Sequence, residues 1–86
     1  MVSISAVLPA YNEEAIIADT ARSVAAVLQG LVADYEVIVV NDGSRDGTAD
    51  RVRAVAAENP RVRLVEHAVN RGYGAALATG FDAATK

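Results

Sequence analysis

Polar side chains follow two apolar stretches of the chain, at the points where strands would end. Asp42 comes just after the apolar run of residues 37–40, and Gly43 follows it. A second polar loop, residues 9–14, follows the apolar segment 4–8. In open parallel sheets the ligand crevice lies at the carboxyl ends of the strands, and glycine lets the backbone approach a ligand closely. We therefore expect these two loops to form half of a nucleotide pocket, with Asp42 projecting into it.

Apolar, strand-like stretches alternate with helix-like stretches along the chain, which is typical of folds built on a parallel sheet. The run that ends at Val40 is nearly continuous, as expected of a central strand, whereas the third stretch alternates and belongs nearer an edge. We expect a three-layer α/β fold with a Rossmann-like parallel sheet, the strand order 3-2-1 and right-handed crossovers. The expected strands are residues 4–8, 35–40 and 61–66, and the expected helices follow Asn12, follow Asp46 and span residues 75–84.

Polar residues also mark where the first two helices should begin. Asn12 is the expected N-cap of the first helix, with Glu13 and Glu14 in its first turn, where the helix dipole favours acidic side chains. Ser44 or Asp46 is expected to cap the second helix. On this local pattern alone, Glu13 and Glu14 are dipole partners more often than ligands.

His67 directly follows the third expected strand, and we assign it to the same face as Val62 and Leu64. A single histidine without cysteine or histidine partners is poor support for a metal site. The loop that starts at Asp42 has acidic and polar residues at the spacing of a calcium loop, but Arg53 stands where the bidentate glutamate should be. We therefore expect no metal site in this chain.

Composition narrows the class of protein. With 86 residues the chain makes one domain with a thin core, and 52% of its residues are hydrophobic. The net charge is −3 and the arginines are scattered, so nucleic acid is not an expected partner. The sequence has no cysteine, which excludes disulfides, thiolate metal sites and thiol redox chemistry. No apolar run approaches the ~20 residues that span a bilayer, so we expect a soluble, cytoplasmic chain.

Three motifs lie in order along nearly the whole chain: residues 8–14 (LPAYNEE), residues 35–48 (YEVIVVNDGSRDGT) and residues 70–76 (NRGYGAA). Together they resemble the opening of family 2 glycosyltransferases with the GT-A fold. Within that family the chain is most similar to the branch that moves a sugar from a nucleotide sugar to a polyprenyl phosphate, such as the dolichyl-phosphate sugar transferases. The resemblance implies that residues 1–86 are the N-terminal, nucleotide-binding part of a GT-A domain.

The resemblance also implies roles for single residues. In the family the loop after the first strand lies against the base and ribose, and the aspartate of the second loop accepts a hydrogen bond from the base. Tyr11 offers a flat face for stacking, and an ionised Asp42 suits the imide N–H of uracil or guanine. Arg71 matches a position that approaches the nucleotide in some members, where a guanidinium suits a diphosphate. The implied nucleotide-binding residues are Pro9, Ala10, Tyr11, Glu13, Asp42 and Arg71.

Two departures from the family pattern matter. Asn41 stands where the family usually has a second acidic residue, so one charge is lost from the pocket. The Asp-x-Asp motif that holds Mg²⁺ or Mn²⁺ on the diphosphate would come after Lys86, as would any catalytic base and the acceptor site. We therefore expect no catalytic residue and no metal ligand in this chain, and little or no transfer by the chain alone. The parent enzyme is expected to use Mg²⁺ or Mn²⁺.

Alternatives from two other classes remain open. One is a nucleotide-binding or assembly module without catalysis, whose reading frame would also end at Lys86. The other is a receiver-type signalling domain with Asp42 as its phosphate acceptor, although receivers carry that aspartate after the third strand. A strand ending in Asp-x-Asp just beyond Lys86 would favour the glycosyltransferase.

The same interpretation extends to partners and location. The parent is expected to bind a UDP- or GDP-linked sugar and to pass the sugar to a membrane lipid, a polyprenyl phosphate, at the cytoplasmic face of a membrane. The first strand would be an exposed edge, because the strand that should pair with it carries the missing metal motif. Exposed edges invite pairing with another copy of the chain, so we hypothesise a homodimer through this strand.

Overall fold

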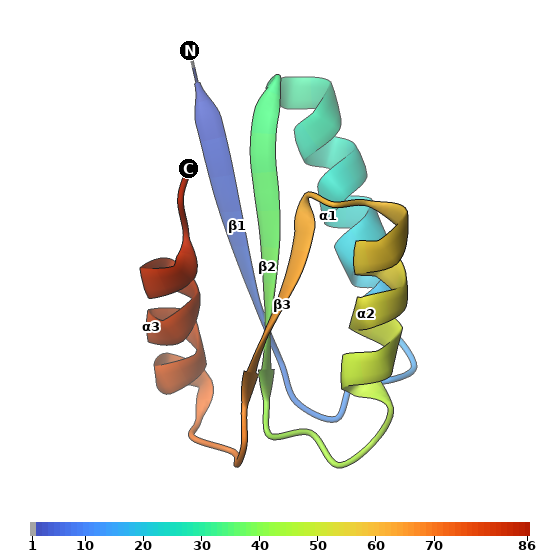
Figure 1. The fold of residues 1–86 in the computed structure, drawn as a ribbon, viewed down its shortest axis with the longest axis vertical. Coiled ribbons are helices and arrows are strands. Elements are labelled where there is room, and N and C mark those ends of the chain that lie inside the picture. The colour runs from blue at the N-terminus through green and yellow to red at the C-terminus, as the bar shows by residue number, and fades with distance from the viewer. Residues whose placement is uncertain (1) are drawn as a thin grey trace.

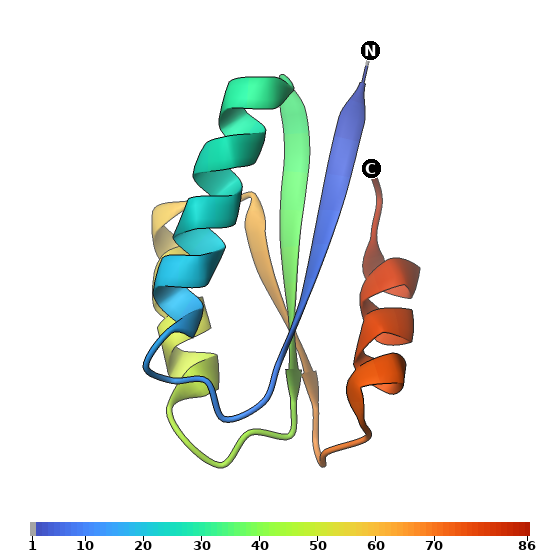
Figure 2. The same cartoon turned by 180° about the vertical axis from the view of Figure 1, so that it is seen from behind.

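The computed structural model describes residues 2–86, which form a sheet of three parallel strands covered by helices on both faces (Figure 1). The first two helices, α1 and α2, cover one face, and the third, α3, covers the other, as Figure 2 shows from behind. The elements in chain order are β1 (Ser3–Ala10), α1 (Ile17–Leu31), β2 (Asp34–Asp42), α2 (Thr48–Glu58), β3 (Val62–His67) and α3 (Tyr73–Ala83). The predicted three-layer α/β fold is therefore confirmed.

Strand β2 lies in the middle of the sheet, between β1 and β3. This arrangement is the predicted order 3-2-1 read from the opposite edge. The parallel register places Ala10 opposite Asn41 and Asp42 opposite His67, so all three strands end along one edge of the sheet. Residues 37–40 are fully buried, which agrees with the continuous apolar run that predicted a central strand.

The two faces of the sheet bury different sets of side chains. Val37 and Val39 pack with residues of α1 and α2 in the larger core. Ile38 and Val40, which point to the opposite face because side chains alternate along a strand, pack against Ala76 of α3 in a smaller core. Each buried valine or isoleucine contributes roughly 1.5–3 kcal/mol to stability relative to an exposed one.

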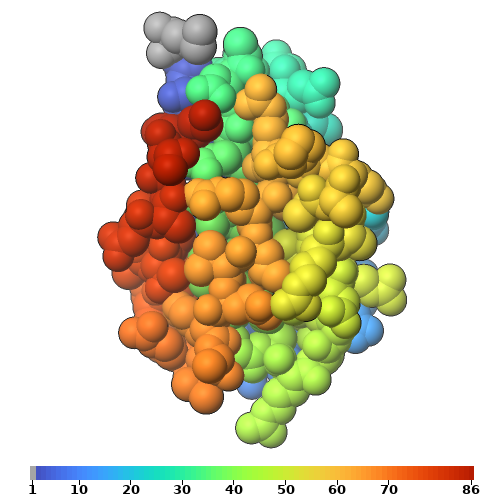
Figure 3. Space-filling model, viewed as in Figure 1, coloured from blue at the N-terminus to red at the C-terminus, as the bar shows by residue number. Residues whose placement is uncertain are grey.

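Helix α3 packs closely against the sheet at Gly80. A Cβ atom added at Gly80 would overlap the side chain of Val7 and crowd that of Val40. The glycine that interrupts the helical pattern is therefore required by packing. In the space-filling view, residues of β3 lie between α3 and α2 on this side of the molecule (Figure 3).

The strands run further than predicted, and the helix starts differ. Strand β1 continues through Pro9 to Ala10, and β2 includes Asp42, which is thus the last strand residue rather than a loop residue. The predicted N-cap Asn12 is wrong: α1 begins at Ile17, and Asn12 adopts a left-handed conformation with φ 50°. Helix α3 begins at Tyr73, two residues earlier than predicted.

The prediction that Ser44 or Asp46 caps the second helix is wrong. Gly47, which has no side chain to accept a hydrogen bond, occupies the N-cap position of α2. Asp46 nevertheless accepts the N–H of Thr48, the first helical residue, with a length of 3.0 Å, whereas Ser44 lies further out and bonds elsewhere.

His67 lies on the face opposite to the one predicted. Val62 and Leu64 belong to the core under α1 and α2, whereas His67 reaches Thr79 on α3. The assignment to the face of Val62 and Leu64 is wrong because His67 is an odd number of residues away from both. Within residues 2–86 every helix is too short or too polar to cross a bilayer.

Candidate functional site

The loops that follow the three strands meet at the carboxyl edge of the sheet, at the bottom of Figure 1. They are residues 11–16 between β1 and α1, residues 43–47 between β2 and α2, and residues 68–72 between β3 and α3. All of the sequence-predicted site residues lie at this edge or in these loops. The structure thus brings together residues that are up to about sixty positions apart in the chain.

A pocket of about 230 Å³ opens between these loops. Five of the six predicted residues line it, and the exception is Arg71. Sequence reasoning missed Tyr73 at the start of α3, which is 70% exposed beside the pocket. The lining residues are Pro9, Ala10, Tyr11, Glu13, Asp42, Asn70, Gly72, Tyr73 and Ala76.

Asp42 is buried at the base of this pocket and is held by three donors. His67 Nδ1 lies 2.8 Å from Asp42 Oδ1, and the backbone N–H of Arg71 donates to the same oxygen at 2.8 Å. The backbone N–H of Gly72 donates to Oδ2 at 2.9 Å. The His67 hydrogen bond first, and then those from Arg71 and Gly72, hold the pKa of Asp42 below its ordinary value against the opposing effect of burial. The carboxylate is therefore ionised and fixed in orientation.

His67 connects the pocket to α3. Its second ring nitrogen, Nε2, lies 2.7 Å from the hydroxyl of Thr79. Because an ionised Asp42 can only accept hydrogen bonds, Nδ1 must carry the proton that His67 donates to it. His67 therefore orients the carboxylate at the base of the pocket. The register pairing of the ends of β2 and β3 is the signal that would have placed it beside Asp42.

Arg71 contributes its backbone to the site. Its N–H fixes Asp42, while its side chain is exposed. The adjoining Gly72 has φ 97°, a left-handed conformation that favours glycine, and this turn aims two successive N–H groups at one carboxylate. The amide of Asn70 also donates to the backbone carbonyl of Asp42, at 3.3 Å. The third loop is thus folded around Asp42.

Gly43 allows this close approach. It has φ 71°, and a Cβ atom added there would overlap the backbone of Val69 and Asn70. The glycine after Asp42 therefore lets two loops pack against each other. Asn41, the departure from the family pattern, is buried and is not among the residues that line the pocket. Its side-chain carbonyl accepts the N–H of Ser44 at 3.2 Å and so stabilises the turn.

The first and second loops are linked by reciprocal hydrogen bonds. Glu14 Oε1 accepts the N–H of Gly47 at 2.8 Å, and the N–H of Glu14 donates to Asp46 Oδ2 at 3.2 Å. Asn12 also makes two hydrogen bonds to the second loop, both 2.9 Å long. Its backbone N–H donates to the hydroxyl of Ser44, and its side-chain carbonyl accepts the backbone N–H of Arg45.

Glu14 therefore lies near the N-terminus of α2, where its charge is favourable, and outside the first turn of α1. Glu13 both lines the pocket and anchors α1, because its carbonyl accepts the N–H groups of Ile16 and Ile17. Its own N–H donates to the hydroxyl of Thr48 at 2.9 Å. These links hold the loop that carries Tyr11, which is 44% exposed at the mouth of the pocket.

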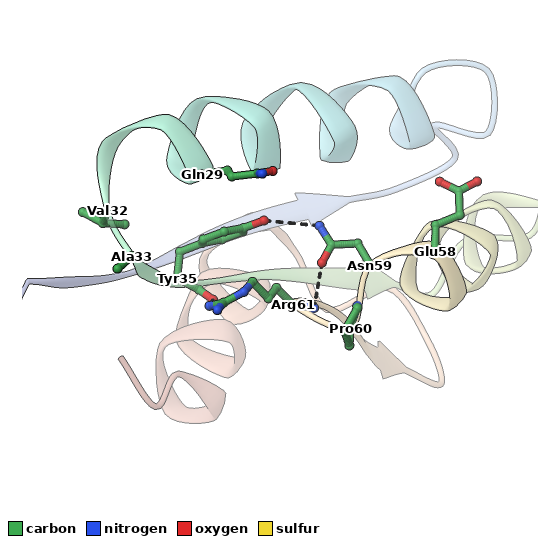
Figure 4. Close-up of a pocket in the computed structure, with 8 residues that line it drawn as sticks. All are labelled: Gln29, Val32, Ala33, Tyr35, Glu58, Asn59, Pro60 and Arg61. Carbon is green, nitrogen blue, oxygen red and sulfur yellow. Dashed lines mark hydrogen bonds between the residues drawn. The ribbon is translucent and has the colours of Figure 1, made fainter.

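A second cavity, of about 550 Å³, lies at the opposite end of the sheet (Figure 4). Its polar groups bond to one another: the side-chain amide of Asn59 donates to the Tyr35 hydroxyl at 3.3 Å, and Asn59 Oδ1 accepts the backbone N–H of Arg61 at 3.0 Å. The Arg61 guanidinium lies 4.9 Å from the centre of the Tyr35 ring. This cavity contains none of the predicted site residues, and we interpret it as a structural junction between α1, α2 and β2.

Within the described part of the chain, no group of three or more His, Cys, Asp or Glu side chains comes together as metal ligands. The residues present therefore do not make a site for Mg²⁺ or Mn²⁺. The chemistry that they can support is the binding of a flat, hydrogen-bonding group between Tyr11, Tyr73 and the fixed carboxylate of Asp42.

Known proteins are similar to this chain in sequence. The chain is 41% identical over 83 residues to the undecaprenyl-phosphate 4-deoxy-4-formamido-L-arabinose transferase of Aeromonas hydrophila, covering 94% of this chain and 25% of that protein. The chain thus spans about a quarter of the length of this relative.

Two solved structures have the same fold. The mannosyltransferase of Pyrobaculum calidifontis in complex with GDP-Man and Mn²⁺ matches with a TM-score of 0.80 and 31% identity over 95% of this chain and 24% of that one. The glucosyl-3-phosphoglycerate synthase of Mycobacterium tuberculosis in complex with UDP matches with a TM-score of 0.74 and 34% identity, over 96% of this chain and 30% of that one.

The family model for glycosyl transferase family 2 matches residues 5–86, which include all three strands of the sheet except the first two residues of β1. The matched segment contains every residue of the pocket described above. Sequence motifs, fold and family model agree, and the chain belongs to glycosyl transferase family 2.

Proposed function

We propose that this chain is the nucleotide-binding part of a glycosyltransferase that uses a UDP- or GDP-linked sugar. The observation that carries the proposal is the pocket that unites Tyr11 from the first loop with Asp42 from the second. The base would stack on the ring of Tyr11 and donate an N–H to the carboxylate of Asp42, with Pro9, Ala10 and Glu13 along the base and ribose.

The hydrogen bonds around Asp42 support this role. A carboxylate has about four acceptor positions, and three donors already fix Asp42. The ligand would therefore meet an acceptor whose position and ionisation are set before binding, which reduces the ordering cost of recognition. The exposed guanidinium of Arg71, next to this site in the chain, would attract the diphosphate.

A divalent cation would belong to the parent enzyme, which we propose to use Mg²⁺ or Mn²⁺. Such a cation stabilises the negative charge that develops on the departing diphosphate. The residues that would hold the cation are not among those described here, since residues 2–86 bring together no cluster of three or more possible ligands. Nucleotide binding without sugar transfer is the expected activity of the chain by itself.

The proposed acceptor is a polyprenyl phosphate. The relative from Aeromonas hydrophila is named as an undecaprenyl-phosphate sugar transferase and is 41% identical to this chain. A lipid acceptor would place the parent at the cytoplasmic face of a membrane.

The receiver-type alternative is disfavoured by the position of Asp42 in the fold. Receivers carry their phosphate acceptor after the third strand, whereas Asp42 is the last residue of the second strand, β2. The remaining alternative, a nucleotide-binding module without catalysis, shares the same pocket and differs only in what accompanies it in the full protein.

The edge strand β1 supports the proposed self-association. It lies at the border of the sheet, and residues 4–9 are only half-buried. An unpaired strand edge can accept another strand, so we propose a homodimer of the isolated chain through β1. Light scattering at high protein concentration tests this, and a monomer there would contradict it.

Isothermal titration calorimetry with UDP and GDP, with and without Mn²⁺, tests the proposed function. We expect binding of at least one nucleotide, no gain from Mn²⁺, and loss of binding in Asp42→Ala. Asp82→Ala is the matched control, because Asp82 is an exposed aspartate on α3 that does not line the pocket. Equal binding by Asp42→Ala and the wild type would contradict the assignment of Asp42 to the nucleotide site.

A further inference from the structure

A second buried carboxylate, Glu36, lies near the amino-terminal end of the sheet, far from the pocket. It sits on β2, on the face covered by α3, and is 5% exposed. Its pKa falls from 4.5 to about 2, because hydrogen bonds from Thr85, Ser5 and Arg63 outweigh burial, which is the largest influence and acts in the opposite direction. An ionised, buried carboxylate is tolerated only when it is fully bonded.

The two oxygens of Glu36 have different partners. Oε1 accepts hydrogen bonds from both Nε and Nη2 of Arg63 on β3, at 3.1 and 2.9 Å. Oε2 accepts the Ser5 hydroxyl from β1 at 2.7 Å and the backbone N–H groups of Thr85 and Lys86 at 2.6 and 3.1 Å. The Thr85 hydroxyl adds a further bond at 3.0 Å. One carboxylate on β2 thus bonds to both flanking strands, β1 and β3, and to the backbone that leaves α3.

Arg63 binds the carbonyl side of the turn that leaves α3, residues 83–86. Its Nη2 donates to the carbonyl of Ala83, the last residue of α3, at 2.6 Å. The last carbonyls of a helix lack partners within the helix, and α3 has no basic residue in its own last turn. Arg63 on β3 therefore supplies the donor for a C-terminal carbonyl of α3 that no side chain in the last turn of α3 supplies. The turn is bound on its carbonyl side by Arg63 and on its N–H side by Glu36.

The direction of the chain after this turn follows from Lys86. Its N–H also donates to the hydroxyl of Ser5, at 3.1 Å, and its ammonium lies 3.0 Å from Asp34 Oδ1. Ser5 belongs to the edge strand β1, whose other side faces no strand among the described residues. Figure 1 shows the C-terminus beside the amino-terminal half of β1.

We infer that Glu36 and Arg63 form a clamp that positions the backbone leaving α3 at the open edge of β1. In a parent of the length of the relatives, a segment entering there would lie alongside β1 and run toward the same sheet edge as the nucleotide pocket. Glu36 would then be a positioning residue for that segment, without touching substrate or nucleotide. The inference goes beyond the proposed function and does not depend on nucleotide binding.

Nuclear magnetic resonance of the 86-residue chain tests the clamp. In Glu36→Gln we expect the backbone amides of Thr85 and Lys86 to lose order in relaxation measurements and to exchange with solvent at least tenfold faster. Resonances of pocket residues should stay unchanged. Glu66→Gln is the matched control, because Glu66 is another strand carboxylate paired with an arginine, Arg53, but its side chain is 43% exposed. A change at Thr85 and Lys86 in Glu66→Gln as large as that in Glu36→Gln would overturn the inference, as would unchanged amides in Glu36→Gln.

A second variant, Thr85→Pro, tests the same clamp in case Glu36→Gln does not fold. It removes the N–H and the hydroxyl that Thr85 donates, at an exposed position outside every helix and strand. We expect the amide of Lys86 to become disordered while the sheet keeps its spectrum. An ordered Lys86 in Thr85→Pro would mean that the clamp does not hold this segment.

Discussion

His67 Nδ1 lies 2.8 Å from Asp42 Oδ1, and both side chains are only 5% exposed. The two residues are register partners at the ends of neighbouring strands, so the sheet itself sets their separation. Through Thr79 the same imidazole reaches α3, which covers this face of the sheet. The carboxylate proposed to read the nucleotide is therefore fixed by His67 of β3, which is in turn held by Thr79 of α3.

Replacement of His67 by phenylalanine should destabilise the chain and weaken nucleotide binding. Asp42 would keep the two backbone donors but lose its side-chain donor inside a buried site, and leaving a buried group unsatisfied costs roughly 1–3 kcal/mol. Urea unfolding and calorimetric titration measure the two effects. Thr79→Val, which removes only the outer hydrogen bond of His67, is the control and should change both quantities less. Equal losses of stability and of nucleotide affinity in the two variants would show that the hydrogen bond from His67 to Asp42 contributes to neither quantity.

Protonation of Glu36 should lower the stability of the folded chain in acid. The pKa of Glu36 is about 2 in the folded chain, because of its hydrogen bonds, and 4.5 is its ordinary value. A carboxyl whose pKa is lower in the folded state adds stability above its unfolded pKa, and that stability is lost as the pH falls toward the folded pKa. The free energy of unfolding should therefore decrease between pH 4.5 and about 2.

Urea titrations across that range measure this dependence. In Glu36→Gln the decrease should be smaller, because the group that binds the proton is gone. The exposed Glu66→Gln should keep the acid dependence of the wild type. An identical acid dependence in Glu36→Gln and the wild type would contradict the role of Glu36 in the buried clamp.

Alanine at Gly43 should open the third loop. The residue would have to adopt φ 71°, which costs about 1–2 kcal/mol for a residue with a Cβ, and its methyl group would overlap Val69 and Asn70. We expect a loss of stability above that figure and faster exchange of the Arg71 and Gly72 amides that bind Asp42. Gly30→Ala is the matched control, since a Cβ there meets no atom within 4 Å and a helical alanine is favoured by roughly 0.5–1 kcal/mol. Destabilisation of similar size in both variants would refute this account of Gly43.

Much of the fold could be predicted from the sequence because its signals are local. The apolar run 37–40 identified the central strand, and Asp42 and Tyr11 were placed at the sheet edge by their positions after strands. The N-cap of the first helix could not be predicted from Asn12, because the same side chain can either cap a helix or bond another loop. Its side-chain carbonyl accepts the N–H of Arg45 in the second loop, more than thirty residues away, and no local pattern reports such a contact.

Other parts of the site depend on pairing between elements. Asp42 and His67 become neighbours only once the register of β2 and β3 is known. An error of one position along β3 assigned His67 to the wrong face, since side chains alternate with a period of two. Tyr73 was missed for a different reason: within its motif it resembles an ordinary turn residue, and only the packing of α3 brings it to the pocket.

Replacement of Glu14 by alanine should loosen the pocket without removing any residue that lines it. The Glu14 carboxylate accepts the N–H of Gly47 near the N-terminus of α2, where a negative charge is favourable. Losing this bond should cost about 1 kcal/mol of stability and separate the loop of Tyr11 from the second loop. We expect weaker nucleotide binding, with faster exchange of the Gly47 amide. Glu14→Gln keeps an oxygen in the same place and should retain most of the affinity, because the hydrogen bond survives the loss of charge. If Glu14→Ala binds nucleotide as tightly as the wild type, the links between the first two loops do not contribute to the site.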